Sequence, residues 1–416
     1  MSLLGDLREL HSKDGMFDEI NIGVSYPIGF PILDQQLGFY QDIKMKDGSI
    51  HRQVRLGVPA GTITMFCGPS QSGKTAAAIQ AAYNIIEPFG DDGVVFHFDA
   101  EESTEPQRVL DLTGMTVTEY KDRYTLLNDD DARTYEGILK KVAELAEYKE
   151  ANKSRLLYNT GFYDIYGEEI IHYIPSCIII DSQMKVTSEA LAENMSELDG
   201  LTGAGREAIF RGKFYRNILS YCKKYNINVF VINHLGNDIQ MQPGKGGPKQ
   251  LTFVPTGKNI PGGDKALYYT TSLVIWQPVN SKDMIKNEDE SGYNGNPVKS
   301  LVCKSRSGGN TGCTATLEFI QSAGYDPRFT LLNLAKEHGL IQGRNPKCYF
   351  ESDPDVKFDT RIFLKEMTDN PAILRALFQG CKPILQAMVR EPAGDDDFIR
   401  GRKSRLEVRN LMKDLY

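Results

Sequence analysis

Short apolar runs alternate with stretches of helical periodicity between Gly61 and about Pro278. The runs are strand-sized and rich in β-branched and aromatic residues: TITMFC, GVVFHFD, SCIIIDS, INVFVINH and YTTSLVIWQ. Helical spacing lies between them, as in AAAIQAAYNII and FRGKFYRNILSYCKKYN. Strands separated by helices favour a parallel sheet, and a run with no polar alternation, such as CIIID, indicates a strand covered on both faces. The pattern predicts an α/β core.

The pattern changes on both sides of this region. NPVKSLVCKSR and TATLEFI flank SGGNTG and predict an antiparallel hairpin that continues the sheet, which extends the core to residues 61–338. Residues 1–60 predict a short N-terminal helix, MSLLGDLREL, then a linker with a polar hairpin or loop insertion between Gly38 and Pro59. Residues 339–390 predict a small α-rich C-terminal domain, and residues 391–416 a charged tail with an acidic and then a basic stretch.

Composition narrows the function classes. The chain has 416 residues, of which 41% are hydrophobic and 25% charged, as in ordinary globular proteins. No apolar run approaches the roughly 18 residues that span a bilayer, and the N-terminus lacks the apolar region of a signal peptide, so we expect a cytoplasmic protein without membrane contact. Seven scattered cysteines without a Cys-x-x-Cys pair predict reduced, buried thiols and no zinc. The net charge of −7 argues against a globally basic nucleic-acid-binding surface but allows a local one.

GPSQSGKT follows the first strand of the core and leads into an alanine-rich helix. Gly68, Gly73, Lys74 and Thr75 fit the pattern G-x-x-x-x-G-K-[ST], in which backbone N–H groups and the helix dipole bind phosphate oxygens. The lysine of this pattern reaches the β and γ phosphates, and the threonine hydroxyl binds Mg²⁺. The predicted ATP-binding loop comprises Gly68, Pro69, Ser70, Gln71, Ser72, Gly73, Lys74, Thr75 and Ala76.

Carboxylates end two further strands of the core. Asp181 closes CIIID and would hold Mg²⁺ through water, although a strand-end helix cap is an alternative interpretation. Asp99, Glu101 and Glu102 follow GVVFHF, where one of them could orient the attacking water. The alternative for this second cluster is a solvated loop.

The order of these motifs resembles the RecA-type recombinases. The phosphate loop, a strand ending in DAE, IIIDS, FVINH and PGGDKALYYTTSLVIW follow one another, and then come KSRSGGNTGCTATLEF and GYDPRFTLLNLAKEHGLI. With His234 ending the fourth strand and KSR downstream, the sequence most resembles the tailed-phage, UvsX-type members. The resemblance covers about residues 25–390. It implies a RecA-like P-loop ATPase core. It also implies a cytoplasmic protein, which for a phage protein means the cytoplasm of an infected bacterial cell.

The resemblance also implies roles for single residues. Glu101 would activate water, and Glu105 and Arg108 would lie near the adenine, where bacterial members have a tyrosine in place of the arginine. His234 would sense the γ-phosphate, where bacterial members carry glutamine; a strand-end histidine without that role is the alternative. Lys304 and Arg306, two apart on a strand and so facing the same way, would contact the γ-phosphate of the adjacent subunit. Exposed charges at a sheet edge are the alternative for this pair.

Two DNA-binding loops are implied. The second, residues 236–263, is glycine-rich and locally basic, and it carries Lys245, Lys249, Phe253 and Lys258. A passive insertion is the alternative. The first would lie around Asn194 to Lys213, with Arg206, Arg211 and Lys213 as phosphate contacts. The N-terminal helix would pack on the adjacent protomer, and the basic end of the tail, Arg400 to Lys413, could bind DNA or a partner.

The resemblance implies an ATP- and Mg²⁺-dependent recombinase that forms helical filaments on single-stranded DNA and exchanges strands with a homologous duplex. The residues alone imply an ATPase with a mobile basic loop. A single-strand-binding protein and a loading mediator are possible further partners. Two alternatives stay open: a hexameric helicase with the same core, and a nucleotide-dependent DNA-binding scaffold or mediator.

Overall fold

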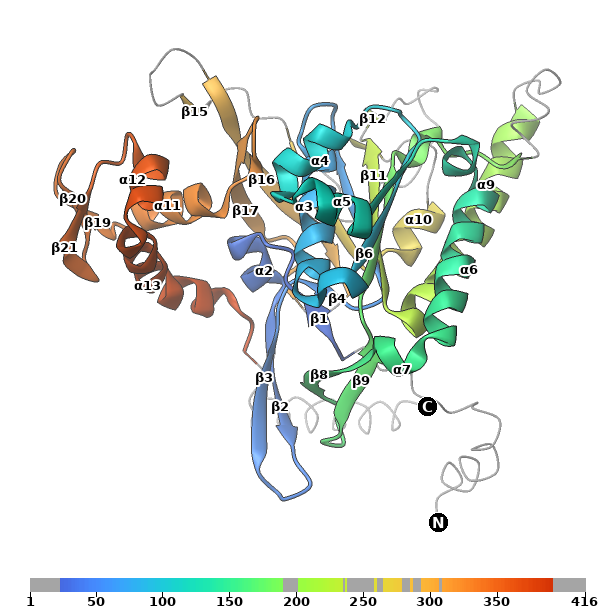
Figure 1. The fold of residues 1–416 in the computed structure, drawn as a ribbon, viewed down its shortest axis with the longest axis horizontal. Coiled ribbons are helices and arrows are strands. Elements are labelled where there is room, and N and C mark those ends of the chain that lie inside the picture. The colour runs from blue at the N-terminus through green and yellow to red at the C-terminus, as the bar shows by residue number, and fades with distance from the viewer. Residues whose placement is uncertain are drawn as a thin grey trace, which may run out of the picture.

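A ten-stranded sheet is the centre of the molecule (Figure 1). The computed structural model describes residues 23–189, 201–234, 236–237, 258–259, 265–278, 285–286, 293–306 and 309–391. The strand order is β18-β17-β16-β14-β5-β11-β10-β6-β7, and β15 pairs with β16. The strands are β5 (Ile63–Gly68), β6 (Val94–Asp99), β7 (Tyr124–Leu127), β10 (Ser176–Asp181), β11 (Ile227–His234), β14 (Leu273–Trp276), β15 (Ile285–Lys286), β16 (Tyr293–Ser305), β17 (Thr314–Ile320) and β18 (Gly324–Tyr325).

Six neighbouring strands of this sheet, from β14 through β5, β11, β10 and β6 to β7, are parallel. β16, β17 and β18 continue the sheet in antiparallel pairs. The predicted α/β core with a mostly parallel sheet and an antiparallel edge hairpin is therefore confirmed. β12 (Gly236–Asn237), which follows β11, lies at the top of Figure 1, so the carboxyl ends of the parallel strands point upward there.

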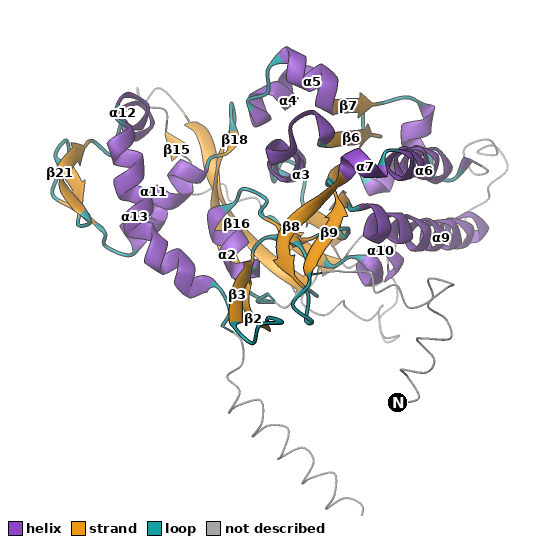
Figure 2. Ribbon diagram, turned by 60° about the horizontal axis from the view of Figure 1, so that its bottom comes forward, coloured by secondary structure: helices purple, strands orange, loops and turns teal. Residues whose placement is uncertain are grey.

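The parallel strands are buried on both faces because their side chains alternate between two apolar clusters. Ile179 belongs to the cluster beneath α3 (Lys74–Ile86), whereas Ile178 and Ile180 belong to the cluster beneath α6 (Tyr135–Ala151) and α9 (Leu201–Tyr225). This double burial explains the unbroken apolar run CIII. α4 (Pro106–Thr113) and α5 (Val117–Arg123) lie on the α3 side, and α10 (Lys265–Thr270) lies on the α9 side (Figure 2).

Small elements extend the amino edge of the sheet. β1 (Ser25–Tyr26) pairs with β4 (Val58–Pro59), and α2 (Pro31–Leu37) packs against β17. β2 (Phe39–Lys44) and β3 (Ile50–Arg55) form the hairpin expected between Gly38 and Pro59. A second hairpin, of β8 (Leu157–Tyr163) and β9 (Glu169–Tyr173), follows the short helix α7 (Lys153–Leu156) and was not predicted. Both hairpins point to the bottom of Figure 1.

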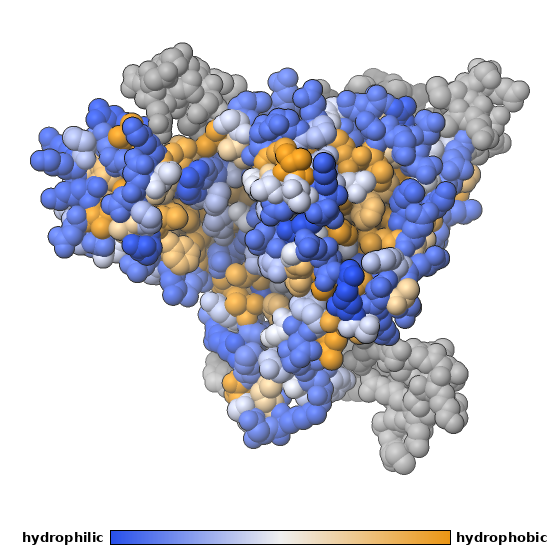
Figure 3. All heavy atoms as spheres, viewed as in Figure 1, coloured by the Kyte–Doolittle hydropathy of each residue, from blue (hydrophilic) through white to orange (hydrophobic). Residues whose placement is uncertain are grey.

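The C-terminal lobe, residues 339–391, lies at one side of the core next to α11 (Pro327–Glu337) (Figures 1 and 2). It contains the expected helices, α12 (Phe363–Asp369) and α13 (Pro371–Met388). It also contains an unpredicted three-stranded sheet of β19 (Ile341–Gln342), β20 (Cys348–Phe350) and β21 (Asp353–Phe358). Buried side chains of this lobe join the cluster beneath α3, so the lobe shares the core of the α/β unit. Figure 3 shows apolar residues between lobe and core on a mostly hydrophilic face.

Several predictions concern segments outside the described residues. These are the N-terminal helix of residues 1–22 and the tail after residue 391, so both stay predictions. Across the described part of the chain, no helix is both long and apolar enough to cross a bilayer.

Candidate functional site: a phosphate loop with a carboxylate cluster

The phosphate loop connects β5 to α3 at the carboxyl edge of the sheet. Gly73 is the N-cap of α3 with φ of +81°, a left-handed conformation that favours glycine. A Cβ at Gly73 would also lie 2.4 Å from the Tyr325 hydroxyl oxygen. The loop therefore requires glycine at this position for two reasons, and the N-terminus of a 13-residue helix directs its free N–H groups toward it.

Lys74 lies folded back across the loop. Its Nζ donates a hydrogen bond to the Pro69 carbonyl oxygen at 2.6 Å and lies 3.5 Å from Ser72 Oγ. The side chain is buried, and burial lowers the pKa of Lys74 from its ordinary value while the nearby Asp181 carboxylate opposes this shift. A buried ammonium group that donates to a backbone carbonyl and lies near a hydroxyl is well suited to bind an anion here.

Thr75 and Asp181 meet as the Mg²⁺ hypothesis requires. Thr75 Oγ1 donates to Asp181 Oδ2 at 2.7 Å. Asp181 ends β10, is 2% exposed, and burial raises its pKa to about 7, with the Glu101 and Asp99 carboxylates adding to the increase. Carboxylates held this close together favour a cation among them. Within the described ranges no group of three or more His, Cys, Asp or Glu residues is placed to hold a metal ion.

Glu101 and His234 come from adjacent parts of the same sheet edge. Ser182 Oγ donates to Glu101 Oε1 at 2.5 Å, and His234 Nε2 lies 3.5 Å from the same oxygen. About a third of each of the Glu101 and His234 side chains is exposed. The structure thus brings together Lys74, Thr75, Asp181, Glu101 and His234, all of which the sequence analysis proposed for one site.

Asp99 of the same carboxylate cluster is buried together with His97, which the sequence analysis missed. His97 and Asp99 lie on β6 and are almost completely buried. His97 Nδ1 hydrogen-bonds with the Tyr124 hydroxyl at 2.8 Å, and Asp99 Oδ2 accepts a hydrogen bond from the Thr104 N–H at 2.8 Å. Burial lowers the pKa of His97 to about 4, although the Asp99 carboxylate acts in the opposite direction. These contacts fix the turn that carries Glu101.

Tyr325 and Gln277 support the phosphate loop from below and were also missed. Gln277 Nε2 donates to the Tyr325 hydroxyl at 3.0 Å, and that hydroxyl donates to the Ser72 carbonyl oxygen at 3.3 Å. Gly68 packs on the Gln277 backbone, where a Cβ would lie 2.1 Å from the carbonyl oxygen. The residues that make these contacts are 48 to 253 positions apart in sequence, so no local signal could reveal them.

Lys304 and Arg306 lie far from the phosphate loop of their own chain. Val274 on β14 is paired with Lys304 on one side and with Met65 of β5 on the other, so Lys304 lies at the height of Met65 in the sheet. The Arg306 N–H donates to the Ser272 carbonyl oxygen, and the Ser272 N–H donates to the Ile63 carbonyl oxygen, so Arg306 lies at the height of Ile63. Arg306 is thus about five residues below Gly68, or roughly 16 Å along the strand. It follows the last residue of β16 instead of lying within the strand. An arginine side chain cannot cover that distance.

The environment of Lys304 supports a shared face with Arg306. Lys304 Nζ lies 4.6 Å from the centre of the Tyr268 ring and donates to the Tyr268 carbonyl oxygen. Burial lowers its pKa to about 8, and the Arg306 charge adds to this effect. The two cations therefore lie close enough to interact.

The proposed adenine residues lie at the start of α4. Glu105 is exposed and is the N-cap of α4, without a side-chain capping bond. Arg108 Nη1 donates to the Gln321 carbonyl oxygen at 2.6 Å and so links α4 to the turn between β17 and β18. Their contact with adenine stays a prediction.

The expected first DNA loop is different in the structure. α9 is one helix from Leu201 to Tyr225, so Arg206, Arg211 and Lys213 lie on a helix and not on a loop. Arg211 Nε donates to the Tyr135 hydroxyl at 2.9 Å, whereas Lys213 is exposed.

Most of the second DNA loop lies outside the described residues, including Lys245, Lys249 and Phe253. β12 pairs in antiparallel register with β13 (Lys258–Asn259). The expectation of a loop without regular structure is therefore corrected at its two ends, which meet beside His234.

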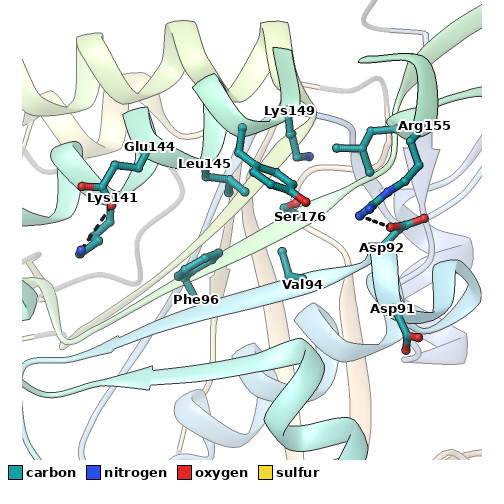
Figure 4. Close-up of a pocket in the computed structure, with 12 residues that line it drawn as sticks. Asp91, Asp92, Val94, Phe96, Lys141, Glu144, Leu145, Lys149, Arg155 and Ser176 are labelled. Carbon is teal, nitrogen blue, oxygen red and sulfur yellow. Dashed lines mark hydrogen bonds and ion pairs between the residues drawn. The ribbon is translucent and has the colours of Figure 1, made fainter. Parts of the chain in front are cut away.

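An apolar pocket of about 380 Å³ lies at the opposite edge of the sheet (Figure 4). Val94 and Ser176, the first residues of β6 and β10, are part of its lining. Four of its charged groups form two ion pairs, Lys141 with Glu144 at 3.3 Å and Arg155 with Asp92 at 2.7 Å. The buried Lys149 instead donates to the Ile174 and Tyr225 carbonyl oxygens. Its position separates it from the phosphate loop, and it takes no part in the candidate site.

Comparison with known proteins finds similarity among solved structures but no match to a family or a curated sequence. No family model and no curated protein matches the chain. Among solved structures, that of the RadB recombinase is similar over 64% of this chain and 90% of that chain, with 17% sequence identity and a TM-score of 0.37. A similarity at this level carries no argument about function.

Proposed function

We propose that the chain is a RecA-type, ATP-dependent DNA recombinase, which forms helical filaments on single-stranded DNA and exchanges strands with a homologous duplex. The contact between Glu101 and His234 carries the proposal. Glu101 belongs to the carboxylate cluster at the phosphate loop, and His234 immediately precedes the glycine-rich basic segment. A chain of side-chain contacts therefore joins the phosphate loop to a segment with the composition of a DNA-binding loop.

ATP with Mg²⁺ fits the residues at the phosphate loop. The N–H groups of residues 68–76 and the Lys74 ammonium would hold the phosphates, and Thr75 with Asp181 would hold Mg²⁺, the latter through water. When bound, the metal neutralises phosphate charge. Glu101 positions the attacking water and accepts its proton, while Ser182 fixes the orientation of the carboxylate.

His234 would transmit the state of the nucleotide. In the structure its Nε2 lies near Glu101, and a γ-phosphate in the site offers a competing acceptor. A change of partner by His234 alters the start of the segment that follows it. Because β12 pairs with β13, such a change would act on both ends of the DNA-binding segment together.

Assembly would complete the site. The phosphate loop lies at the carboxyl edge of the sheet, and Lys304 with Arg306 lie toward the amino edge. These cations can therefore serve a phosphate loop only if it belongs to another copy. A head-to-tail contact of this kind is heterologous, and repetition generates a helical filament unless the rotation closes a ring.

DNA would bind along the segment after His234. Lys245, Lys249 and Lys258 would contact phosphates, and Phe253 would stack on or wedge between bases. Arg206 and Lys213 on α9 are further candidates, and Arg211 would need to leave Tyr135. Base pairing between the strands would read the sequence. A tailed-phage origin, an infected-cell cytoplasm, a single-strand-binding protein and a loading mediator belong to this proposal as expectations from the resemblance.

Strand exchange between a circular single strand and a homologous linear duplex tests the function, with ATP, without ATP, and with Lys74→Ala as the inactive control. The proposal expects joint molecules only with ATP and the unchanged chain. Electron microscopy of the same mixtures separates the alternatives. Rings with unwinding of a forked duplex would establish the helicase, and DNA binding that survives without any turnover would establish the scaffold.

A further inference from the structure

A second pocket, which we call the basic pocket, opens at the amino edge of the sheet. Its volume is about 290 Å³, near the lower end of the roughly 300–1,000 Å³ range of small-molecule sites. It lies between β1, the end of β3, the last turns of α9 and the residues that precede β14. The lining residues are Val24, Ser25, Phe39, Arg55, Pro59, Thr62, Leu219, Lys223, Thr270, Ser272 and Arg306.

Three cations and no carboxylate line the basic pocket. The cations are Arg55, Lys223 and Arg306, which come from three separate elements of the fold. Within the described part of the chain, none of the three forms an ion pair. Arg55 is half-buried, and burial lowers its pKa from the ordinary value, so its charge is partly desolvated without a counter-ion. Uncompensated cations gathered in one cavity favour an anion in it.

Unpartnered polar atoms in the same cavity are a second, independent observation. Ser25 is 9% exposed and lines the pocket, and its Oγ has no hydrogen-bond partner among the described residues. Arg55 Nε is likewise buried without a partner there, while its guanidinium carbon lies 5.4 Å from the Phe39 ring centre. Buried polar groups are almost always paired, so two donors left unpaired in one cavity indicate a ligand with acceptor oxygens.

We propose that the basic pocket binds a phosphate group through Arg55, Lys223 and Arg306, with Ser25 as a neutral donor. A phosphate offers several acceptor oxygens and more than one negative charge, which matches two arginines and a lysine. Because Arg306 lines this pocket, the phosphate in an assembly is the terminal one of the nucleotide on a second copy, and this assignment of source rests on the proposed function. The other source of the same chemistry is free phosphate.

Binding of inorganic pyrophosphate to the full chain tests the pocket itself. Lys74→Ala is used as the background because it weakens phosphate binding at the phosphate loop. We expect one equivalent of pyrophosphate to bind this variant in calorimetry, with an affinity at least tenfold lower after Arg55→Gln or Lys223→Gln is added. Lys224→Gln is the matched control, because Lys224 faces Glu150 at 3.7 Å and the Tyr225 ring. No binding, or binding that all these substitutions leave unchanged, overturns the proposal.

Folding and source are controlled separately. Lys223 is partly exposed, so Lys223→Gln is expected to keep the thermal unfolding midpoint even if Arg55→Gln does not. For the source, Lys74→Ala chains, which keep the pocket, are mixed with Arg55→Gln/Lys223→Gln chains, which keep the phosphate loop. DNA-dependent ATP turnover above the sum of the two separate samples assigns the phosphate to the adjacent copy.

The two proposals fail in different ways. Pyrophosphate binding by the pocket without recovery in the mixture assigns the site to free phosphate and removes its role in assembly. An unchanged chain that hydrolyses no ATP with DNA contradicts the proposed function, yet the pyrophosphate result still decides the pocket. Normal turnover with no pocket binding leaves the proposed function in place and rejects the pocket.

Discussion

The Nε2 atom of His234 lies 3.5 Å from the Oε1 atom of Glu101, and the Ser182 hydroxyl contacts the same oxygen. We predict that Glu101→Gln lowers ATP turnover by a factor of about 10² or more, the usual effect of removing a general base. Nucleotide binding should change little, because Lys74 and the loop N–H groups are retained. Single-turnover hydrolysis and binding of a fluorescent nucleotide measure the two effects.

Glu102→Gln is the matched control for Glu101. Glu102 is the next residue, but it is exposed and paired with Arg133, away from His234. Turnover should stay within about twofold of the unchanged chain, as is usual for exposed ion pairs. Equal loss in both variants would mean that Glu101 has no special role in water activation.

The cations at the amino edge should act only in an assembly. We predict that Lys304→Ala/Arg306→Ala lowers DNA-stimulated turnover by a factor of about 10³, as loss of an arginine finger does. ATP binding to the dilute chain should stay unchanged, because both residues are far from their own phosphate loop. Lys299→Gln is the control, since Lys299 lies exposed on the same strand. Full turnover by the double variant would reject the composite site.

The phosphate loop and the strand-end carboxylate Asp181 were predictable because each depends on local sequence, whereas Glu101 was distinguished from Asp99 and Glu102 only by the family resemblance. A glycine-rich turn before a helix and a carboxylate at a strand end are patterns of a few neighbouring residues. The parallel sheet was predictable for a similar reason, since doubly covered strands such as CIII have no polar alternation. Each of these features can be recognised without knowing what packs on it.

Other features depend on contacts between distant segments. The Tyr325 hydroxyl contacts the Ser72 carbonyl oxygen across 253 positions, and Ser25 and Arg306 line the same pocket. No hydrophobic periodicity in the sequence indicates either contact. The strands of the C-terminal lobe are short and contain several polar residues, so β20 and β21 gave no alternation signal. α9 continues through Gly212 because neighbouring apolar side chains such as Phe214 pack on α6 and the sheet, which overrides local propensity.

Buried His97 should make stability fall in acid. Its folded-state pKa of about 4 is below the ordinary value of 6.5, so between these values the unfolded chain binds a proton that the folded chain excludes. The contribution is intact above pH 6.5 and is lost as the pH falls toward 4. We expect a loss of about 2 kcal/mol in the free energy of unfolding between pH 7.5 and 5.0 from this group.

Urea denaturation at the two pH values measures this loss. His97→Gln should reduce the pH-dependent difference by about 2 kcal/mol, since glutamine can pair with the Tyr124 hydroxyl but does not titrate in this range. His338→Gln is the control, because His338 is exposed and should keep the difference unchanged. An unchanged difference in His97→Gln would show that His97 does not bind a proton on unfolding.

The segment after His234 should determine how DNA binding depends on salt. Each phosphate contact to a single strand contributes about −0.7 to the slope of log K against log salt concentration. If Lys245, Lys249 and Lys258 each contact a phosphate, Lys245→Gln/Lys249→Gln/Lys258→Gln should make the slope less negative by about 2. Phe253→Ala should weaken binding by about 1–3 kcal/mol and leave the slope unchanged, because stacking releases no counter-ions. Fluorescence anisotropy of a labelled oligonucleotide at several salt concentrations separates the two effects.

The exposed Lys213 on α9 is the internal comparison for this prediction. If Lys213→Gln alone changes the slope as much as the triple substitution does, DNA binds along α9 and not along the segment after His234.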